Sequence, residues 1–134
     1  MTKDTDYAIR TVLYLSSMEG YFAKADEISK NMHIPKSFLM KILKKLEKAG
    51  LVQLKRGVTG GIRLKKKPVE LSLYDIIVAM ENKVVLNRCV NNKKICSLVS
   101  KCPIHPVWFK IRDRFIESLK EITFEELSVK GAAL

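Results

Sequence analysis

Apolar side chains recur at helical spacing in the amino-terminal third of the chain. Residues 6–18, 25–31 and 36–49 each carry such residues at intervals of three and four positions, which predicts three amphipathic helices. The third pattern is the clearest, with apolar residues at Leu39, Ile42, Leu43 and Leu46. Pro35 precedes this segment and Gly50 follows it, and both residues are typical of helix ends.

The next two segments alternate apolar and polar residues. Residues 51–55 and 62–65 show this alternation, which is typical of half-buried strands. The residues between them, 56–61, read Arg-Gly-Val-Thr-Gly-Gly and have the composition of a turn. Helix, short helix, turn, helix and hairpin is the order of a winged helix-turn-helix, which we therefore predict over residues 1–70.

Helical spacing returns in the carboxyl-terminal half, at residues 72–80 and 106–122, and Thr123 has the position of a cap for a final short helix. Residues 81–102 lack periodicity. The long segment carries bulky apolar residues at Val107, Trp108, Ile111, Phe115, Leu119 and Ile122. This stripe exceeds what one small domain needs, so we expect it to pair with a second copy about a two-fold axis. The alternative is packing onto the winged part of the same chain.

The fold class predicted from these patterns is mainly α-helical with a small β-hairpin wing. A length of 134 residues fits one domain, so residues 1–134 form a single unit. It contains the winged helix-turn-helix, an irregular segment over residues 81–102 and a long dimerisation helix over residues 106–122.

Positive charge is concentrated in one third of the chain. The formal net charge is +11, and a net of +10 falls between residues 24 and 67, where 13 basic residues accompany 3 acidic ones. Clustered cations favour a phosphate-binding surface over a merely solvated face. The sequence has no long uncharged apolar run and no apolar leader at its start, so we expect a cytoplasmic protein without a membrane partner.

The predicted DNA contacts come from the third helix and the hairpin. The polar face of the helix consists of Lys36, Ser37, Met40, Lys41, Lys44 and Lys48. Most of these lysines would contact phosphates, whereas Ser37, Met40 and Lys41 are placed for base edges. The predicted wing contacts are Arg56, which could enter a narrow minor groove, and Thr59, Gly60 and Arg63. The alternative is a helix-turn-helix that binds a protein partner.

Three cysteines and a histidine lie within 17 positions of one another, in the pattern Cys89-x6-Cys96-x5-Cys102-x2-His105. An odd number of cysteines excludes a closed disulfide framework. A flexible segment could bring these four side chains to one metal centre, and thiolate ligands suit zinc or an iron–sulfur cluster. We expect His105 at the N-cap of the long helix, because Pro106 follows it. The alternative is that each cysteine is a small buried apolar residue.

The chain resembles the bacterial iron–sulfur winged-helix transcription regulators of the IscR and NsrR family. The matching motifs span nearly the whole sequence: Asp6-Tyr7-Ala8, Ser37-Phe38-Leu39, Ala49-Gly50-Leu51-Val52, the six wing residues 56–61, Asp75-Ile76-Ile77, the three cysteines, Pro106-Val107-Trp108 and residues 122–127. The resemblance implies a homodimeric cytosolic transcription factor, commonly a repressor, whose binding to double-stranded DNA depends on a bound cluster.

The resemblance also implies a ligand set. Cys89, Cys96 and Cys102 would be the thiolate ligands. His105 matches the fourth ligand of the IscR type, which holds a 2Fe–2S cluster, and Asp6 falls where the NsrR type supplies an aspartate from the partner subunit to a 4Fe–4S cluster. The resemblance favours 2Fe–2S over 4Fe–4S. Met40 and Lys41 stand where IscR carries Glu and Gln, so no operator sequence can be transferred.

We therefore expect a repressor controlled by an iron–sulfur cluster that senses iron, redox state or nitric oxide. The alternative is a cofactor-free winged-helix regulator controlled by a protein partner. We do not expect an enzyme, because no cysteine has a nearby His–Asp arrangement and the chain has no glycine-rich phosphate loop.

Overall fold

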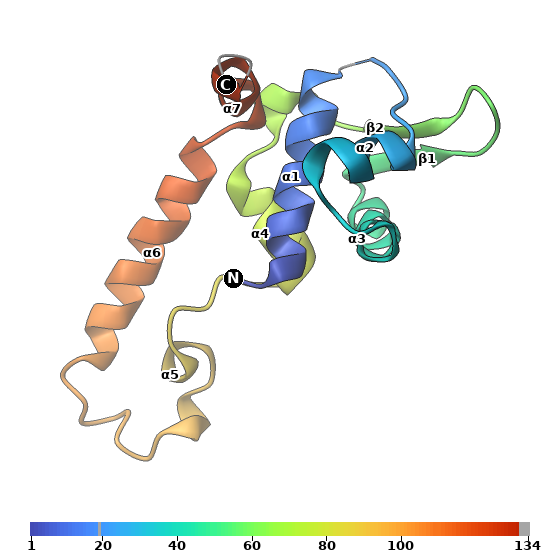
Figure 1. The fold of residues 1–134 in the computed structure, drawn as a ribbon. Coiled ribbons are helices and arrows are strands. Elements are labelled where there is room, and N and C mark those ends of the chain that lie inside the picture. Colours follow the sequence, from blue (N-terminus) through green and yellow to red (C-terminus); the bar gives the residue numbers. More distant parts are fainter. Residues whose placement is uncertain (19, 132–134) are drawn as a thin grey trace.

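The computed structural model describes residues 1–18 and 20–131, which form a mainly helical chain with one two-stranded sheet (Figure 1). In chain order the elements are α1 (Lys3–Ser17), α2 (Ala25–Met32), α3 (Lys36–Lys48), β1 (Val52–Lys55), β2 (Gly61–Leu64), η1 (Pro68–Glu70), α4 (Leu73–Glu81), α5 (Arg88–Asn91), η2 (Lys93–Ile95), α6 (His105–Glu121) and α7 (Phe124–Gly131). Every helix and strand predicted from the sequence is present, with ends that differ by a few residues. No helix among the described residues is long and apolar enough to cross a membrane.

The core lies between α1, α3, α4, α7 and the inner face of the hairpin. α1 packs against α3, α4 and α7, and Phe124 at the start of α7 is fully buried. The four apolar residues predicted for the inner face of α3 are all fully buried: Leu39, Ile42, Leu43 and Leu46. The apolar face of α3 is therefore packed into the core, and its polar face is left to solvent.

The wing (residues 52–64) is an antiparallel hairpin held to the helix-turn-helix by a short third segment. Within the hairpin Val52 pairs with Leu64 and Lys55 pairs with Gly61. Ala23, just before α2, exchanges two backbone hydrogen bonds with Ile62, with N···O distances of 2.8 and 2.7 Å. The base of the wing is therefore fixed to the start of α2.

Helix caps explain where several elements begin. Thr2 caps α1 by accepting a hydrogen bond from the Thr5 backbone N–H, at 3.2 Å, and so α1 begins three residues before the predicted position. Ser72 and Asp75 form a capping box at α4. Thr123 accepts from the Glu126 N–H at α7, as the sequence predicts.

The prediction that His105 is the N-cap of the long helix is wrong. Ile104 is the N-cap, and His105 is the first helical residue. Pro106 is accommodated at the second position because the first backbone N–H groups of a helix need no acceptor within it. The segment between α4 and α6 (residues 82–104), hereafter the cysteine segment, also differs from expectation, because it contains the short helices α5 and η2.

α6 is inclined away from the winged part of the molecule (Figure 1). Its carboxyl-terminal end joins the core through Leu119, which is buried, and it packs against α4. Its amino-terminal end lies beside α5. Val107, Ile111 and Phe115 remain 41%, 44% and 37% exposed, so much of the predicted apolar stripe is not used within the chain.

Candidate nucleic-acid interface and metal-ligand segment

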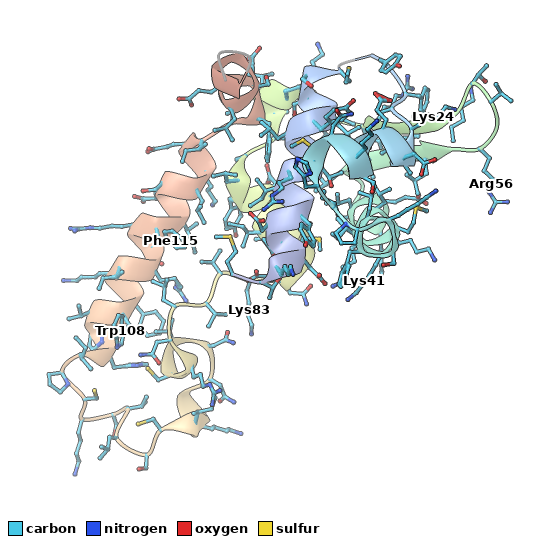
Figure 2. The ribbon with its side chains drawn as sticks, in the orientation of Figure 1. Lys24, Lys41, Arg56, Lys83, Trp108 and Phe115 are labelled. Atoms are coloured by element: carbon cyan, nitrogen blue, oxygen red, sulfur yellow. The ribbon has the colours of Figure 1, made fainter. Side chains whose placement is uncertain are left out.

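The outer face of α3 exposes the whole set of residues predicted for DNA contact. Lys36, Ser37, Met40, Lys41, Lys44 and Lys48 are all exposed. Figure 2 shows Lys41 on this face and Arg56 at the tip of the wing, both on the outside of the molecule. The helix and the wing therefore present cations from two elements of the winged part.

Two of these lysines already have carboxylate partners within the chain. Lys36 Nζ lies 2.5 Å from Asp26 Oδ1, and both side chains are largely exposed. Lys41 Nζ lies 3.1 Å from Asp4 Oδ2, on the first turn of α1. Exposed ion pairs contribute little to stability, so Lys36 can exchange its carboxylate for a phosphate at small cost. Asp4 was not predicted, because the pair joins residues 37 positions apart.

The wing tip (residues 56–60) combines exposed and buried positions. Arg56 and Thr59 are exposed, whereas Gly60 is buried. The Gly60 N–H donates to the Gly57 carbonyl at 3.1 Å, and a Cβ at position 60 would lie 2.1 Å from the Lys55 carbonyl oxygen. Gly60 therefore shapes the turn, and its N–H is used within the wing; its contact with DNA stays a prediction.

Arg63 is engaged with neighbours on the outer face of the hairpin. Its Nε donates to Gln53 Oε1 at 3.0 Å, and its guanidinium carbon lies 4.6 Å from the centre of the Phe22 ring. Contact with DNA would have to come from its remaining donors. The sequence did not predict that Arg63 contacts Gln53 and Phe22. These contacts depend on the pairing register of the hairpin and on the bridge between Ala23 and Ile62.

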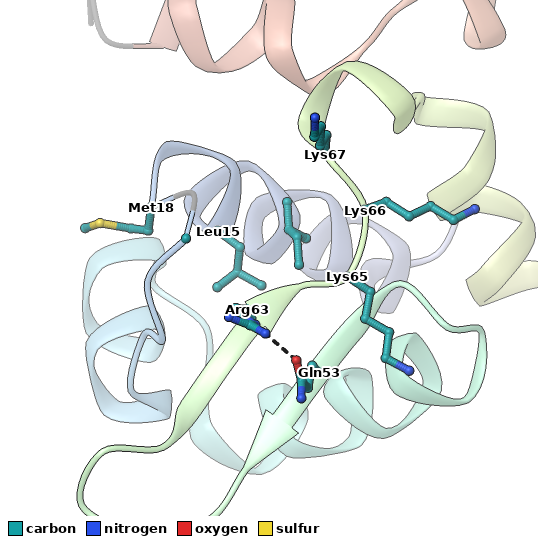
Figure 3. A pocket seen from close by; sticks show the side chains of 9 residues that line it. Leu15, Met18, Gln53, Arg63, Lys65, Lys66 and Lys67 are labelled. Carbon is teal, nitrogen blue, oxygen red and sulfur yellow. Dashed lines mark hydrogen bonds between the residues drawn. The ribbon is translucent and has the colours of Figure 1, made fainter.

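A pocket of about 340 Å³ adjoins Arg63, and three consecutive lysines, residues 65–67, lie on its rim. Three lysines whose ammonium groups converged on one point would form an anion-binding site. Figure 3 shows instead that the side chains of Lys65, Lys66 and Lys67 point in three different directions. Their ammonium groups do not converge on one point, so these lysines add to the general positive potential of this face.

The three cysteines are free and half-buried, and all lie in the cysteine segment. Cys89 is in α5, Cys96 directly follows η2, and Cys102 comes shortly before α6. α5 packs against α6, so the segment is attached to the helix whose first residue is His105.

His105 is a buried imidazole without a polar partner. The residue is 8% exposed, and neither ring nitrogen has a hydrogen-bond partner among the described residues. Its ring meets the Phe109 ring edge-on, with 5.0 Å between the centroids. Burying an unpaired polar group is costly, and such a group requires an explanation.

The structure does not bring the four predicted donors together. Across residues 1–18 and 20–131, no group of three or more His, Cys, Asp or Glu side chains is close enough to hold a metal ion. Asp6, the alternative fourth ligand, lies on α1, where its side chain is 53% exposed and its carboxylate pairs with Arg10 at 2.7 Å.

A hydrogen-bonded junction ties the start of α1 to the start of the cysteine segment. Glu81, the last residue of α4, accepts from the Thr2 backbone N–H at 2.8 Å and from Thr5 Oγ1 at 2.6 Å. Partial burial alone would raise the pKa of Glu81, but these hydrogen bonds outweigh it and hold the pKa below its usual value. Asp4, the partner of Lys41, lies between the two threonines in sequence.

Curated relatives cover nearly the whole chain. The chain is 34% identical over 131 residues to the HTH-type transcriptional regulator IscR of Aliivibrio salmonicida, covering 96% of this chain and 77% of that protein. It is 30% identical over 129 residues to the regulator NsrR of Bacillus licheniformis, covering 95% and 90%. It is also 32% identical over 128 residues to the protein aau3 of Rhizobium meliloti, covering 95% and 83%.

Solved structures share the fold. CymR of B. subtilis, named as the global cysteine regulator of that organism, aligns with a TM-score of 0.76 at 22% identity, over 97% of this chain and 96% of that one. IscR of T. potens aligns with a TM-score of 0.75 at 22% identity, over 100% and 88%. These likenesses confirm the predicted winged-helix fold class.

The family assignment rests on the length of the match. Residues 1–130 match the Rrf2 family, which is described as an iron-dependent transcriptional regulator. The IscR and NsrR relatives are named as transcriptional regulators and not as enzymes, as the sequence predicts. The chain therefore belongs to the Rrf2 family of DNA-binding transcription regulators.

Proposed function

We propose that this regulator is a homodimeric repressor whose operator binding is controlled by an iron–sulfur cluster. Cys89, Cys96, Cys102 and His105 would hold the cluster. The observation that carries the proposal is the pair of unpartnered, buried ring nitrogens of His105, at the end of a segment with three free thiols.

The donor set fits such a cluster in chemical type. Thiolates and a neutral imidazole are ligands of 2Fe–2S centres. A ligand at either ring nitrogen of His105 would relieve the cost of burying that nitrogen without a partner. The buried ring nitrogens of His105, which have no partner among the described residues, favour His105 over the exposed Asp6 as the fourth ligand, and with it 2Fe–2S over 4Fe–4S. When bound, the cluster would supply a centre sensitive to iron supply, redox state or nitric oxide.

The position of the cysteine segment supports control of DNA binding. With Cys89, Cys96 and Cys102 bound to one group, residues 82–104 would be held close to the start of α6. α6 would then be held relative to α4 and to the winged part, through contacts that α6 already makes with α4 and α5. Because ligand binding shifts populations between conformations, such a change would alter the fraction of molecules that can bind DNA.

The exposed stripe on α6 supports the dimer. Val107, Ile111 and Phe115 recur every four residues and are all more than one third exposed. The same stripe on a second copy is its own complement about a two-fold axis. A two-fold dimer would set two α3 helices against half-sites about 34–36 Å apart or a multiple of that spacing.

The DNA surface would be the outer face of α3 together with the wing tip. Lys36, Lys44 and Lys48 would contact phosphates, Ser37, Met40 and Lys41 would face base edges, and Arg56 and Thr59 would reach the flanking groove. Support comes from the exposure of all these side chains. The target is double-stranded DNA.

A cofactor-free regulator controlled by a protein partner is the second candidate. The separation of the four donors in the structure favours it. The two candidates differ in the composition of the purified protein, so the test measures that composition directly.

The chain is purified without oxygen, and its visible spectrum, iron and acid-labile sulfide are measured beside those of Cys96→Ala, His105→Ala and Asp6→Ala. The proposal predicts a coloured wild-type protein with about two iron and two sulfide per chain. It further predicts no cluster in Cys96→Ala, a labile cluster in His105→Ala and an unchanged cluster in Asp6→Ala. A colourless, iron-free wild type supports the cofactor-free candidate.

A further inference from the structure

Lys24 places its ammonium group among three backbone carbonyls of the wing tip. Its Nζ donates to the carbonyl oxygens of Gly57 at 3.3 Å, of Val58 at 2.7 Å and of Gly60. Figure 2 shows Lys24 beside the wing, on the side of α2. An ammonium group has three donors, and all three find an acceptor here.

The wing turn itself creates the need for a cation. Gly57 has a φ of +101°, and the Gly60 N–H turns back onto the Gly57 carbonyl. This path brings three carbonyl oxygens toward one point. Like-oriented dipoles repel one another, and a positively charged donor offsets that repulsion with charge-assisted hydrogen bonds.

Lys24 is held from the opposite side by the body of the molecule. Its backbone N–H donates to Glu27 Oε1 at 3.2 Å. Its neighbour Ala23 is paired with Ile62 through two hydrogen bonds. The ammonium group therefore links a fixed backbone position to the wing tip, which otherwise projects from the hairpin into solvent (Figure 1).

We propose that Lys24 is a positioning residue, which holds the wing tip in the conformation that presents Arg56 and Thr59 to DNA. The inference rests on the proposed DNA surface and adds to it a residue that the sequence did not suggest. Lys24 acts through the wing, because its three donors are already used by the carbonyls of residues 57, 58 and 60. A lysine that binds phosphate directly would have to release them.

The first experiment tests whether Lys24 stabilises the wing tip in the free protein, by amide hydrogen exchange of Gly60. Lys24→Met keeps the side-chain length and removes the donors. Exchange at Gly60 should become about tenfold faster or more, because local opening of the tip becomes easier. The Ile62 amide, which bonds to Ala23, should keep its rate. Lys30→Met removes the same charge from an exposed position near the end of α2 and should change neither rate.

The consequence for DNA is tested with a double-mutant cycle on a duplex of about 30 base pairs, selected by the wild-type protein from a random pool. If the ordered tip falls to about one tenth of the population, Lys24→Met should weaken binding about tenfold. In an Arg56→Ala background the same substitution should have little further effect, because both residues act through the tip.

Two results overturn the proposal. An unchanged Gly60 exchange rate in Lys24→Met would show that Lys24 does not stabilise the wing tip. This measurement does not depend on which surface binds DNA. Losses from Lys24→Met and Arg56→Ala that simply add would make Lys24 an independent phosphate contact. A tip that is mostly open in Lys24→Met, with no loss of DNA affinity, would instead refute the proposed role of the wing in binding.

Discussion

At the scale of single residues, the lysines on the outer face of α3 differ in what surrounds them. Lys41 is paired with Asp4 at 3.1 Å, and the Asp4 side chain is only 24% exposed. Lys44 is exposed on the same face. A charge that already has a carboxylate partner gains less from a phosphate than a solvated charge does, since the carboxylate must be displaced.

Lys44→Ala should weaken DNA binding about equally for all sequences. A lysine that contacts phosphate releases about one counterion when it binds, so the slope of log affinity against log salt should fall by roughly 1. Binding titrations at several salt concentrations, on specific and unrelated duplexes, measure both quantities. An unchanged slope would place Lys44 away from the phosphates.

Asp4→Asn should strengthen DNA binding by about 1.4-fold to fivefold at low salt, because it frees Lys41 from a surface ion pair worth about 0.2–1 kcal/mol. The control is the same substitution in a Lys41→Ala background, where the gain should disappear. If the gain persists there, it reports only the change in net charge.

The candidate DNA-contacting residues of α3 were predictable from the sequence, because their exposure follows from helical periodicity. The two faces of α3 follow from the spacing of Leu39, Ile42, Leu43 and Leu46, and the structure agrees. Lys24, Asp4 and Gln53 were not predictable, because their roles arise from contacts between distant segments or across the hairpin. The burial of Gly60 and the hydrogen bond of its N–H within the wing turn were not predictable either, because both depend on the path of the turn.

At the scale of elements, the junction of α1 and α4 connects the DNA-binding part to the cysteine segment. Glu81 at the end of α4 accepts hydrogen bonds from Thr2 and Thr5 at the start of α1. The cysteine segment begins at the next residue, and Asp4 holds Lys41 from the same turn of α1. In the proposed function, this junction is the route by which a change in the cysteine segment would reach α3.

Glu81→Gln should lower the free energy of unfolding by about 1 kcal/mol at neutral pH, because a charged acceptor is replaced by a neutral one. The folded-state pKa of Glu81 is depressed. Its stabilising effect is therefore present above the unfolded pKa of about 4.3 and is lost as pH falls through the lower folded value. Urea unfolding of both proteins at several pH values measures the difference.

The measured difference should shrink as the pH falls below about 4. A difference that stays constant from pH 7 to pH 3 would mean that the ionised carboxylate contributes nothing beyond its shape. A matched substitution at the exposed Glu117 of α6, Glu117→Gln, should have little effect at any pH.

Element boundaries near α6 show the limit of sequence reasoning at this scale. The rule that a residue before proline avoids helical geometry placed His105 outside the helix, whereas the chain begins to turn at Ile104. The hydrogen bond from the His105 N–H to the Cys102 carbonyl, at 3.3 Å, belongs to the turn before α6. Periodicity cannot reveal such a turn, because it involves too few residues.

At the scale of the whole molecule, one chain leaves an apolar helix face uncovered. Leu119 of α6 is buried, whereas the stripe of Val107, Ile111 and Phe115 remains more than one third exposed. A second copy would cover this face and would fix the distance between two α3 helices. The cysteine segment lies at the amino-terminal end of the same helix.

Phe115→Asp should convert the proposed dimer to a folded monomer. It would place two like charges near the two-fold axis, each removed from water. Light scattering gives the mass, and circular dichroism checks the fold. Lys110→Asp, exposed on another face of α6, should remain dimeric. A folded Phe115→Asp variant that is still dimeric would place the dimer contact elsewhere.

In the proposed function, the state of the cysteine segment controls DNA binding. The direct measurement compares the operator affinity of cluster-bound and cluster-free protein at the same salt concentration. Coupling between two sites is typically 1–3 kcal/mol, so we predict affinities that differ by about fivefold or more. Equal affinities in the two states would contradict the claim.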